Sequence, residues 1–242
     1  MRLGLCGLGK AGKNFVEFVN KSANDKLCAV LCRDTSLTAG KSVIELTHIQ
    51  TDMNLTVQKI SEFTNKEEIE VLIDFSNGET TVKLVEMCCR LGICLVICPT
   101  NILESQLLEF EKMAYEYKIG VIYAPTLTVG INALISFISE FAKENPQFSF
   151  EIIEKHGKNK AKPTKTAQII ADEINRDNIA ISSIRLDGFV GVHEVIATNG
   201  YEKIIFEHES MSRDAFSNGA LVAAQYIVGR VGLFNTKDIR KG

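Results

Sequence analysis

LGLCGLGKAGKNF, residues 3–15, carries a short apolar segment, a glycine-rich turn and the opening of a helix. Gly7, Gly9 and Gly12 form the pattern G-x-G-x-x-G directly after the apolar segment. The first glycine permits a tight turn, the second lets a pyrophosphate approach the helix N-terminus, and the third allows close helix–strand packing. This context favours a dinucleotide-binding loop over a purely structural glycine turn. The candidate cofactor residues of the loop are Gly7, Leu8, Gly9, Lys10, Ala11 and Gly12.

The next apolar run, LCAVLC at 27–32, predicts a second strand whose end would read the adenosine ribose of a dinucleotide. An Asp or Glu at that end favours NAD, whereas an Arg accommodates a 2′-phosphate. The chain has Cys32, Arg33 and Asp34 there, so the expected acid is absent or displaced by one or two residues. Arg33 therefore favours NADPH over NADH. The alternative interpretation is that Arg33 and Asp34 form a solvated surface pair.

The first 125 residues alternate short apolar runs with amphipathic stretches, which is typical of a parallel sheet covered by crossover helices. The apolar runs are 3–6, 27–32, 71–75, 94–98 and 120–124. One helix is expected over 79–91, ending at Gly92. Another is expected after Asn101, because Asn101 and Glu104 have the spacing of a capping box. The polar stretch 34–66 shows only short signals, SVIEL and LTVQKI.

The pattern changes after Pro125 to a second domain. Its expected elements are helices over 130–143 and 166–175 and strands over 148–156, 180–186, 191–198 and 203–211. Strands without intervening helices imply antiparallel pairing, and Asn199-Gly200 predicts a two-residue hairpin turn. A last helical stretch, 214–231, is expected to pack back on the first domain. The predicted fold class is α/β, with a dinucleotide-binding domain (1–126 plus 214–242) and a second α+β domain (127–213) carrying a mixed or antiparallel sheet.

Composition and charge narrow the class of protein. The chain has 242 residues, 45% of them hydrophobic, and a formal net charge of −3. The absence of a basic block argues against nucleic-acid binding, and no apolar run approaches the roughly 18 residues that span a bilayer. The N-terminus lacks the features of a signal peptide, so we expect a soluble cytoplasmic protein. The seven cysteines are expected to be reduced, and Cys88-Cys89 lacks metal-ligand spacing, so no metal site is expected.

EIIEKHGKNKAKPTKTA, residues 151–167, is the most informative stretch of the second domain. It places five lysines and one histidine, His156, around a loop that leaves a strand, and then Thr164, Lys165 and Thr166 at the start of a helix. Helix N–H groups, threonine hydroxyls and ammonium groups together make an anion site suited to a small dicarboxylate. His156 would be an acid or an electrostatic stabiliser, since its unperturbed pKa of about 6.5 is near working pH. The alternative is a solvated lysine-rich surface with a structural histidine.

Several blocks along nearly the whole chain carry a family resemblance. They are the glycine loop at 7–12, IDFS at 73–76, TVGIN at 128–132, EIIEKH at 151–156 with Lys160, PTKTA at 163–167, GVHEV at 191–195 and FEHESMSRDAFSNGAL at 206–221. With these blocks the chain resembles dihydrodipicolinate reductase, the lysine-biosynthesis enzymes that use NADH or NADPH to reduce a cyclic unsaturated dicarboxylate. The resemblance implies a Rossmann domain and a substrate domain whose mixed sheet assembles a homotetramer. It also implies that the last helix returns to the first domain.

The resemblance implies a role for each matching residue. His156 falls on the active-site histidine of the family and Lys160 on the lysine regarded as the proton donor. Thr166 falls on a carboxylate-binding threonine, with Thr164 at the neighbouring hydroxyl position. The implied reaction is hydride transfer from the nicotinamide to the ring, completed by a proton from Lys160, while His156 and the helix N-terminus hold the ring and its carboxylates. The remaining candidate cofactor residues are Arg33, Asp74, Phe75, Ser76, Cys98, Thr100 and Thr126.

The chain departs from the family pattern at positions that touch substrate or nicotinamide. Gly157 stands where the family has a second histidine. Lys165 replaces a glycine whose backbone approaches the substrate carboxylate, where it either adds a charge-assisted contact or crowds the pocket. The family's Gly-Thr-Thr-Gly is Cys98-Pro99-Thr100-Asn101 here, and Thr126 replaces an asparagine.

These departures leave three hypotheses of function. The first is dihydrodipicolinate reduction, and the second is reduction of another imine carboxylate. The third is a non-catalytic nucleotide-binding homologue. The presence of both His156 and Lys160 at family spacing favours an enzyme over the third hypothesis. His193 and His208 lie in strand-like runs and are expected to be structural or interfacial.

Overall fold

The computed structural model describes residues 1–49, 54–65 and 68–240, which belong to two units. The first unit comprises Met1–Pro125 and Phe216–Gly242, and the second unit comprises Thr126–Ala215. The C-terminal segment therefore returns to the N-terminal unit. Among the described helices, none has both the length and the apolar character required to cross a membrane.

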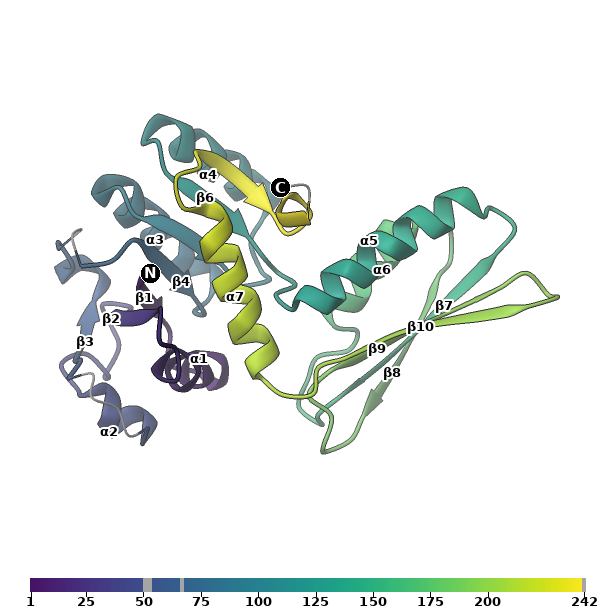
Figure 1. The fold of residues 1–242 in the computed structure, drawn as a ribbon, viewed down its shortest axis with the longest axis horizontal. Helices are drawn as coiled ribbons and strands as arrows, with labels where there is room; N and C mark the ends of the chain where they lie inside the picture. The colour runs from purple at the N-terminus through teal and green to yellow at the C-terminus, as the bar shows by residue number, and fades with distance from the viewer. Residues whose placement is uncertain (50–53, 66–67, 241–242) are drawn as a thin grey trace. The chain divides into compact units, whose positions relative to one another are not determined.

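A seven-stranded parallel sheet forms the centre of the first unit, with the strand order β11-β6-β5-β4-β1-β2-β3 (Figure 1). Its strands are β1 (Arg2–Cys6), β2 (Lys26–Cys32), β3 (Val57–Lys59), β4 (Val71–Asp74), β5 (Cys94–Ile97), β6 (Gly120–Tyr123) and β11 (Gly232–Asn235). The central strand β4 is buried throughout, as expected for a strand covered on both faces. The predicted parallel sheet is thus confirmed.

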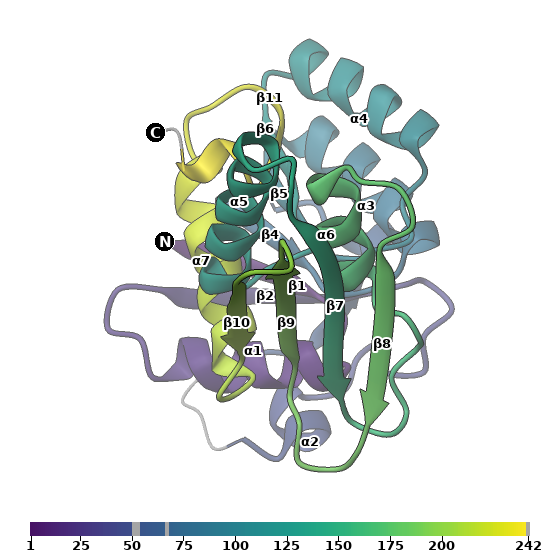
Figure 2. The same cartoon turned by 90° about the vertical axis from the view of Figure 1, so that its right-hand side faces the viewer.

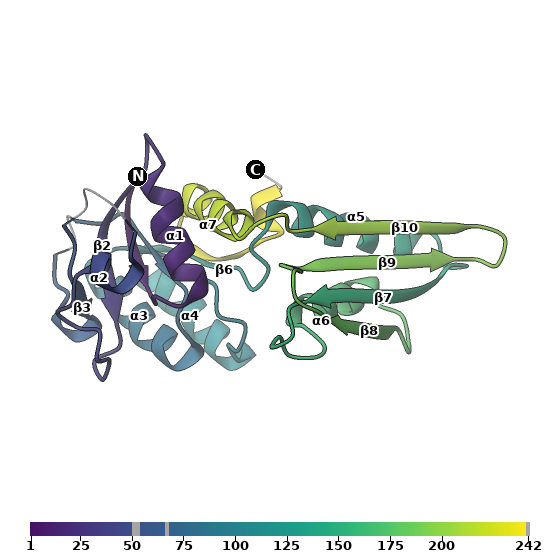
Figure 3. The ribbon, with the colours of Figure 1, turned by 90° about the horizontal axis from the view of Figure 1, so that it is seen from below.

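Helices cover both faces of this sheet. They are α1 (Lys10–Asn20), α3 (Gly78–Leu91), α4 (Glu104–Glu116) and α7 (Asp214–Ile227), with the short α2 (Val43–Thr47) and the 3-10 turns Ile60–Glu62 and Asp238–Arg240. Figure 3 shows α1 and α7 on one face and α3 and α4 on the other. A hydrogen bond from the Ser217 hydroxyl to Asn14 joins α7 to α1. At the end of α3, Gly92 has φ +69° and forms the expected left-handed C-cap.

The second unit is a four-stranded mixed sheet with α5 (Val129–Glu144) and α6 (Lys165–Ile174) on one face (Figure 2). Its strands are β7 (Ser149–His156), β8 (Ala180–Arg185), β9 (Val192–Thr198) and β10 (Lys203–Glu209), in the order β10-β9-β7-β8. The pair β7–β8 is parallel because α6 connects the two strands, and the other pairs are antiparallel. Ile152 and Val195 anchor the apolar core beneath the helices. Further along the same face of β7, the side chains become polar at Glu154 and His156.

Three local expectations are wrong. Asn101 does not cap α4, which begins at Glu104; its side chain accepts from the Gly78 amide at 3.2 Å, and the Leu103 amide donates to the Gln106 side chain instead. The hairpin between β9 and β10 has a four-residue turn, because the Asn199 side chain accepts from the amides of residues 201 and 202 and so holds a wider loop. The last helix ends at residue 227, and the segment after it adds the edge strand β11.

The polar stretch 34–66 contains α2, β3 and the turn Ile60–Glu62, close to the short signals seen in its sequence. Residues 50–53 and 66 of this stretch lie outside the described residues. All seven cysteines are free thiols.

Candidate active site

Gly7, Gly9 and Gly12 each meet a different requirement of the β1–α1 turn. Gly7 has φ +97°, a conformation that favours glycine, and a Cβ on Gly12 would lie 1.8 Å from the Gly7 carbonyl oxygen. Gly9 has space around it, with no described atom within 4 Å of a Cβ built there. It is the N-cap of α1 without a side-chain cap, so the first N–H groups of the helix are open to an anion. The turn therefore fits a dinucleotide pyrophosphate. The rest of the loop is the half-buried Leu8 and Ala11 and the exposed Lys10.

The loop after β4 lies against the glycine turn, because the Phe75 carbonyl oxygen is 2.8 Å from the position of a Gly7 Cβ. Asp74 is fully buried, and its carboxylate accepts from the Ser76 amide at 2.8 Å and from the Thr81 hydroxyl at 2.6 Å. Burial raises the pKa of Asp74 against the opposing effect of these hydrogen bonds. The Asp74 side chain thus shapes the loop, while the half-buried Phe75 and Ser76 line its accessible side.

Arg33 and Asp34, at the end of β2, have different surroundings. Asp34 accepts a hydrogen bond from the Ser61 amide at 3.0 Å, and its other oxygen lies 3.8 Å from the Lys83 ammonium. The Ser61 hydrogen bonds lower the pKa of Asp34. Arg33 is exposed and has no ion pair or side-chain hydrogen bond within the described part of the chain. Of the two side chains, it is Arg33 that is open to a ligand.

Cys98, Thr100 and Thr126 follow β5 and β6. Cys98 is buried and Thr100 is exposed, with its carbonyl oxygen 3.4 Å from the Tyr123 hydroxyl. The buried Thr126 belongs to the second unit, where its hydroxyl donates to the Asn132 side chain at 2.6 Å. Asn132 in turn donates to the Thr126 carbonyl at 2.9 Å, so these two residues fasten the start of α5.

Glu154 is the central residue of a polar cluster in the second unit. Its side chain is fully buried, and one carboxylate oxygen accepts from the Ser183 hydroxyl at 2.5 Å and from Arg185 Nη2 at 2.6 Å. The Thr164 amide and hydroxyl donate to the same carboxylate. One carboxylate of β7 therefore holds β8 and the first residue before α6.

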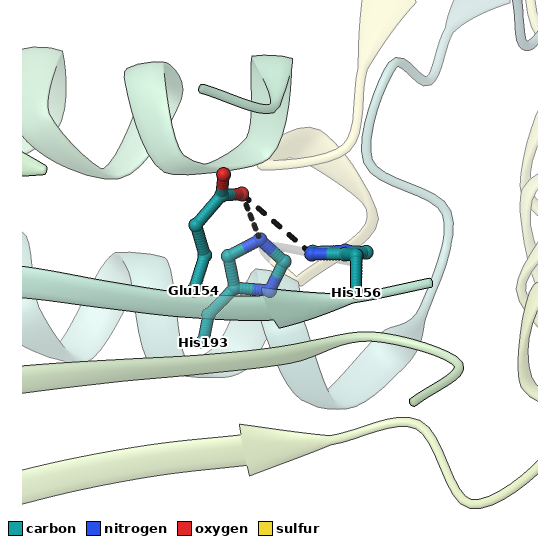
Figure 4. Close-up of side chains that lie close together, drawn as sticks. All are labelled: Glu154, His156 and His193. Carbon is teal, nitrogen blue, oxygen red and sulfur yellow. Dashed lines mark ion pairs between the residues drawn. The ribbon is translucent and has the colours of Figure 1, made fainter. Parts of the chain in front are cut away.

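Two histidines face the other carboxylate oxygen, Oε2 (Figure 4). The Nδ1 atom of His156 lies 3.6 Å from it and the Nε2 atom of His193 lies 4.0 Å from it. The two imidazole rings pack edge to face with centroids 5.1 Å apart. His156, His193 and Glu154 are all buried, although His193 was expected only as a structural or interfacial residue.

The cluster is charged at Glu154 and neutral at the histidines. Burial would raise the pKa of Glu154, but hydrogen bonds from Ser183, Thr164 and Arg185 outweigh it and bring the pKa to about 2. Burial lowers the pKa of His156, and it lowers that of His193 to about 3 with help from the neighbouring His156. The cluster therefore holds an ionised carboxylate beside two neutral imidazoles at neutral pH.

The Thr164 hydroxyl assigns the tautomer of His193. This hydroxyl donates to Glu154, so it can only accept from the His193 Nε2 atom, which lies 3.3 Å away. We therefore assign the proton of His193 to Nε2. Glu154, His156 and His193 offer ligand atoms within 4.8 Å of one another, the spacing of a metal site. The carboxylate is already bonded to Arg185 and two hydroxyl groups, however, so this group is better suited to orienting side chains than to holding a cation.

Lys160 lies in the loop between β7 and α6, and its side chain is exposed. Its amide donates to the Gly157 carbonyl at 3.1 Å, and its carbonyl accepts from Arg185 Nε at 2.9 Å. The ammonium group has no ion pair within the described residues. The backbone of Lys160, the proton donor predicted from the sequence, is therefore fixed by hydrogen bonds, while its ammonium group is exposed.

The N-terminus of α6 begins directly after this loop. Thr164 is its N-cap and is buried, with the side chain accepting from the Ala167 amide at 3.3 Å. Lys165 is exposed and Thr166 is half-buried. The backbone amides of Lys165 and Thr166 have no partner within the described residues, which leaves the helix end open to an anion.

Sequence reasoning missed Glu154, Ser183 and Arg185. Glu154 lies two residues before His156 on the same strand, so the alternation of a β-strand places both on one face. That signal was available in the sequence. Ser183 and Arg185 depend on the register of β7 with β8, which pairs Glu154 with Ser183 and His156 with Arg185.

Two family models together match nearly the whole chain. A family model described as dihydrodipicolinate reductase, N-terminus, matches residues 1–127, and one described as dihydrodipicolinate reductase, C-terminus, matches residues 130–239. A relative from Caldanaerobacter subterraneus, called 4-hydroxy-tetrahydrodipicolinate reductase, is 34% identical over 73% of this chain and 78% of its own length. A protein of the same name from Ralstonia nicotianae is 28% identical over 99% of both chains.

Solved structures show the same fold. The dipicolinate-bound dihydrodipicolinate reductase from Paenisporosarcina sp. TG-14 is similar to this chain with a TM-score of 0.78 and 22% identity, over 97% of both chains. Amine dehydrogenase from Mycobacterium smegmatis is similar with a TM-score of 0.70 and only 8% identity. Proteins with different names and little sequence identity therefore share this fold.

Proposed function

This chain belongs to the dihydrodipicolinate reductase family, and from that premise we propose how its own residues carry out the 4-hydroxy-tetrahydrodipicolinate reductase step of lysine and diaminopimelate biosynthesis. The family assignment supports the first of the three hypotheses of function, reductase activity on the family's substrate, over another imine carboxylate or a non-catalytic homologue. Family members generally use NAD(P)H. The cytoplasmic location remains a prediction from the sequence.

The proposed substrate site is the end of β7 and the start of α6. The open amides of Lys165 and Thr166, the Thr166 hydroxyl and the Lys165 ammonium would bind a carboxylate of the substrate. That a similar protein is dipicolinate-bound supports a dicarboxylate ligand here. Thr164 gives its hydroxyl to Glu154, so its contribution is to hold the helix end in place.

Lys160 is the proposed proton donor and His156 the proposed electrostatic partner of the ring. The observation that carries this proposal is the Glu154 carboxylate, which is bonded to Thr164 and Arg185 and faces His156. The Glu154 carboxylate thus brings together, at one end of β7, the anion site, His156 and the loop of residues 157–163, which we call the lysine loop. The nicotinamide cofactor supplies the hydride, and the protein supplies binding, orientation and a proton.

The test is turnover of the wild-type enzyme and of Lys160→Ala with NADPH and with substrate made by a coupled synthase. Loss of a general acid lowers turnover by about a hundredfold or more. Lys158→Ala is the matched control, because Lys158 is an exposed lysine of the same loop that pairs with Asp187 at 2.5 Å. Unchanged turnover in Lys160→Ala would refute the proton-donor role. Wild-type protein that binds NADPH but turns over no substrate would instead refute the reaction.

NADPH is the proposed cofactor, bound by the glycine turn and read by Arg33. Two observations support it: the space at Gly9, and the engagement of Asp34 with Ser61 and Lys83, which leaves Arg33 as the open side chain. A 2′-phosphate would gain a charge-assisted hydrogen bond from Arg33. Arg33→Ala should lower kcat/KM for NADPH by about tenfold or more and leave NADH little changed, in line with about 1.5–3 kcal/mol for such a bond. Equal losses with both cofactors would contradict this role.

A homotetramer assembled through the open face of the second unit's sheet is the proposed oligomer. Ile184 and Ile205 lie on the face opposite α5 and α6 and are 39% and 48% exposed. Lys155 on the same face pairs with Glu194 at 3.1 Å and with Glu207 at 3.6 Å. A sheet face of this mixed character suits burial against further copies. Ile205→Glu should reduce the mass measured by light scattering, whereas Leu37→Glu in the first unit should not.

A further inference from the structure

The lysine loop is fastened at two consecutive carbonyl groups by one buried side chain, Arg185. Its Nε donates to the Lys160 carbonyl at 2.9 Å, and its Nη2 donates to the Ala161 carbonyl. The same Nη2 donates to Glu154 at 2.6 Å, and Nη1 donates to the Ile184 carbonyl at 2.9 Å. The Arg185 side chain is only 5% exposed, although the carbonyl groups of Lys160, Ala161 and Ile184 that it binds lie at the surface of the unit.

Electrostatic attraction holds this loop only weakly. Lys158 pairs with Asp187 at 2.5 Å, but both side chains are mostly exposed, and an exposed ion pair contributes little. Lys160 and Lys162 are exposed, have no ion pair among the described residues and carry like charges, so they do not hold the loop against the sheet. Arg185 would add a further positive charge, but Glu154 offsets it in a buried ion pair. The planar guanidinium can therefore reach both carbonyls without adding net charge at the site.

We propose that Arg185 is a positioning residue for Lys160, an inference that rests on the proton-donor role of Lys160 in the proposed function. The Glu154 carboxylate bonds both to Arg185, which holds the carbonyl of Lys160, and to Thr164, which begins α6. The ion pair between Glu154 and Arg185 thus fixes the position of Lys160 relative to the N-terminus of α6, where the carboxylate would bind. A misplacement of a catalytic group by about 1 Å costs up to about a hundredfold in rate. Correct placement of Lys160 therefore accounts for a large part of its contribution to turnover.

A double-mutant cycle tests the proposal. Arg185→Lys keeps the positive charge beside Glu154 but cannot form the fork to two carbonyls. It should lower kcat by about tenfold or more, because the donor moves, while KM for the substrate changes by less than about threefold, because the helix end is intact. In the Lys160→Ala background the same change should cost no further kcat, since its effect passes through the missing ammonium. The wild-type enzyme and both single variants are measured beside the double variant.

Arg176→Lys is the matched control. Arg176 also donates to a backbone carbonyl, that of Ala142 at 2.6 Å, but it follows the opposite end of α6 from the lysine loop. This variant should keep wild-type kcat. Arg185→Gln, a planar side chain with two donors and no charge, serves as the second variant if Arg185→Lys does not fold.

Each outcome decides one proposal. Unchanged turnover in Lys160→Ala refutes the proposed function of Lys160 and does not depend on Arg185. A Lys160 effect with full kcat in Arg185→Lys, or losses that add in the double variant, overturns the positioning role alone. Failure of both Arg185 variants to fold would make Arg185 a structural residue and would equally overturn it.

Discussion

The Nδ1 atom of His156 lies 3.6 Å from Oε2 of Glu154 and is buried without a hydrogen-bond partner among the described residues. A buried polar atom without a partner is costly. At 3.6 Å the Glu154 carboxylate is beyond hydrogen-bond distance of the ring but close enough to interact with it electrostatically. This relationship makes Glu154, a residue that the sequence motif did not single out, the support for His156, Thr164 and Arg185 together.

Glu154→Gln should destabilise the second unit. The amide matches the carboxylate in shape, but it leaves the Arg185 charge buried without a counter-charge, and breaking a buried pair from one side costs about 3–5 kcal/mol. Urea unfolding of the wild type and the variant measures the loss. Glu144→Gln is the control, because Glu144 is exposed at the end of α5 and should change stability by less than about 0.5 kcal/mol. A Glu154→Gln variant as stable as Glu144→Gln would show that the ion pair does not stabilise the folded unit.

The stability of the protein should fall as the pH drops below about 6.5, and His193 should account for part of the fall. Its pKa is about 3 in the folded protein against about 6.5 in an unfolded chain, so the unfolded state takes up the proton first. The contribution is fully present above about pH 6.5 and decreases from there toward pH 3. A single proton of this kind changes the unfolding free energy by about 1.4 kcal/mol per pH unit.

His193→Gln should therefore flatten the pH dependence of unfolding between pH 7 and 5. Glutamine keeps an N–H donor for Thr164 but does not titrate. This range avoids the titration of Glu154, whose pKa of about 2 in the folded protein makes its own contribution disappear only at lower pH. His48→Asn, which removes an exposed histidine of the first unit, should keep the wild-type slope. An unchanged slope in His193→Gln would mean that His193 is not held neutral by burial.

Gly191→Ala should lower catalytic efficiency with little loss of stability. A Cβ on Gly191 would lie 3.1 Å from Nε2 of His156, which forces the ring to move by a few tenths of an ångström. The expected result is a fall in kcat/KM of about tenfold with unfolding changed by less than about 1 kcal/mol. Lys158→Ala is the control, because Lys158 is an exposed residue close to His156 in the sequence and pairs with Asp187. Full activity in Gly191→Ala would argue that the position of the His156 ring does not matter for the reaction.

Features that depend on residues close in the sequence were predictable, whereas features that depend on distant partners were not. The strand–turn–helix unit at Gly7 was predictable because its pattern depends on neighbours within a few residues. The edge strand β11 was not, because four residues after a long helix carry no periodic signal of their own. Asn101 has the spacing of a cap for α4, yet its side chain bonds to Gly78 of α3, a partner that only the packing of the two loops supplies.

The candidate site divides in the same way. His156, Lys160 and Thr166 could be named from one continuous segment and its family resemblance. Arg185 lies 25 residues beyond Lys160 and reaches it only because β7 and β8 pair in a particular register. His193 was placed in a strand correctly, but its proximity to Glu154 depends on the antiparallel pairing of β7 with β9. Register is set by the packing of whole strands, so these neighbours were beyond the reach of local patterns.

Gly9→Ala and Gly12→Ala should separate cofactor binding from folding within one turn. Gly9 has φ −70°, which alanine adopts freely, and no described atom lies within 4 Å of its Cβ, so the variant should fold with wild-type thermal stability. Its methyl group would occupy the space through which a pyrophosphate approaches the helix, and NADPH affinity should fall by about tenfold or more. A Cβ on Gly12 would instead lie 1.8 Å from a backbone oxygen that cannot move without opening the turn, so Gly12→Ala should unfold the first unit or leave it strongly destabilised. Fluorescence titration with NADPH and thermal unfolding give both readouts, with Lys158→Ala of the second unit as the control for binding. Wild-type NADPH affinity in a folded Gly9→Ala protein would show that the phosphate does not approach over Gly9.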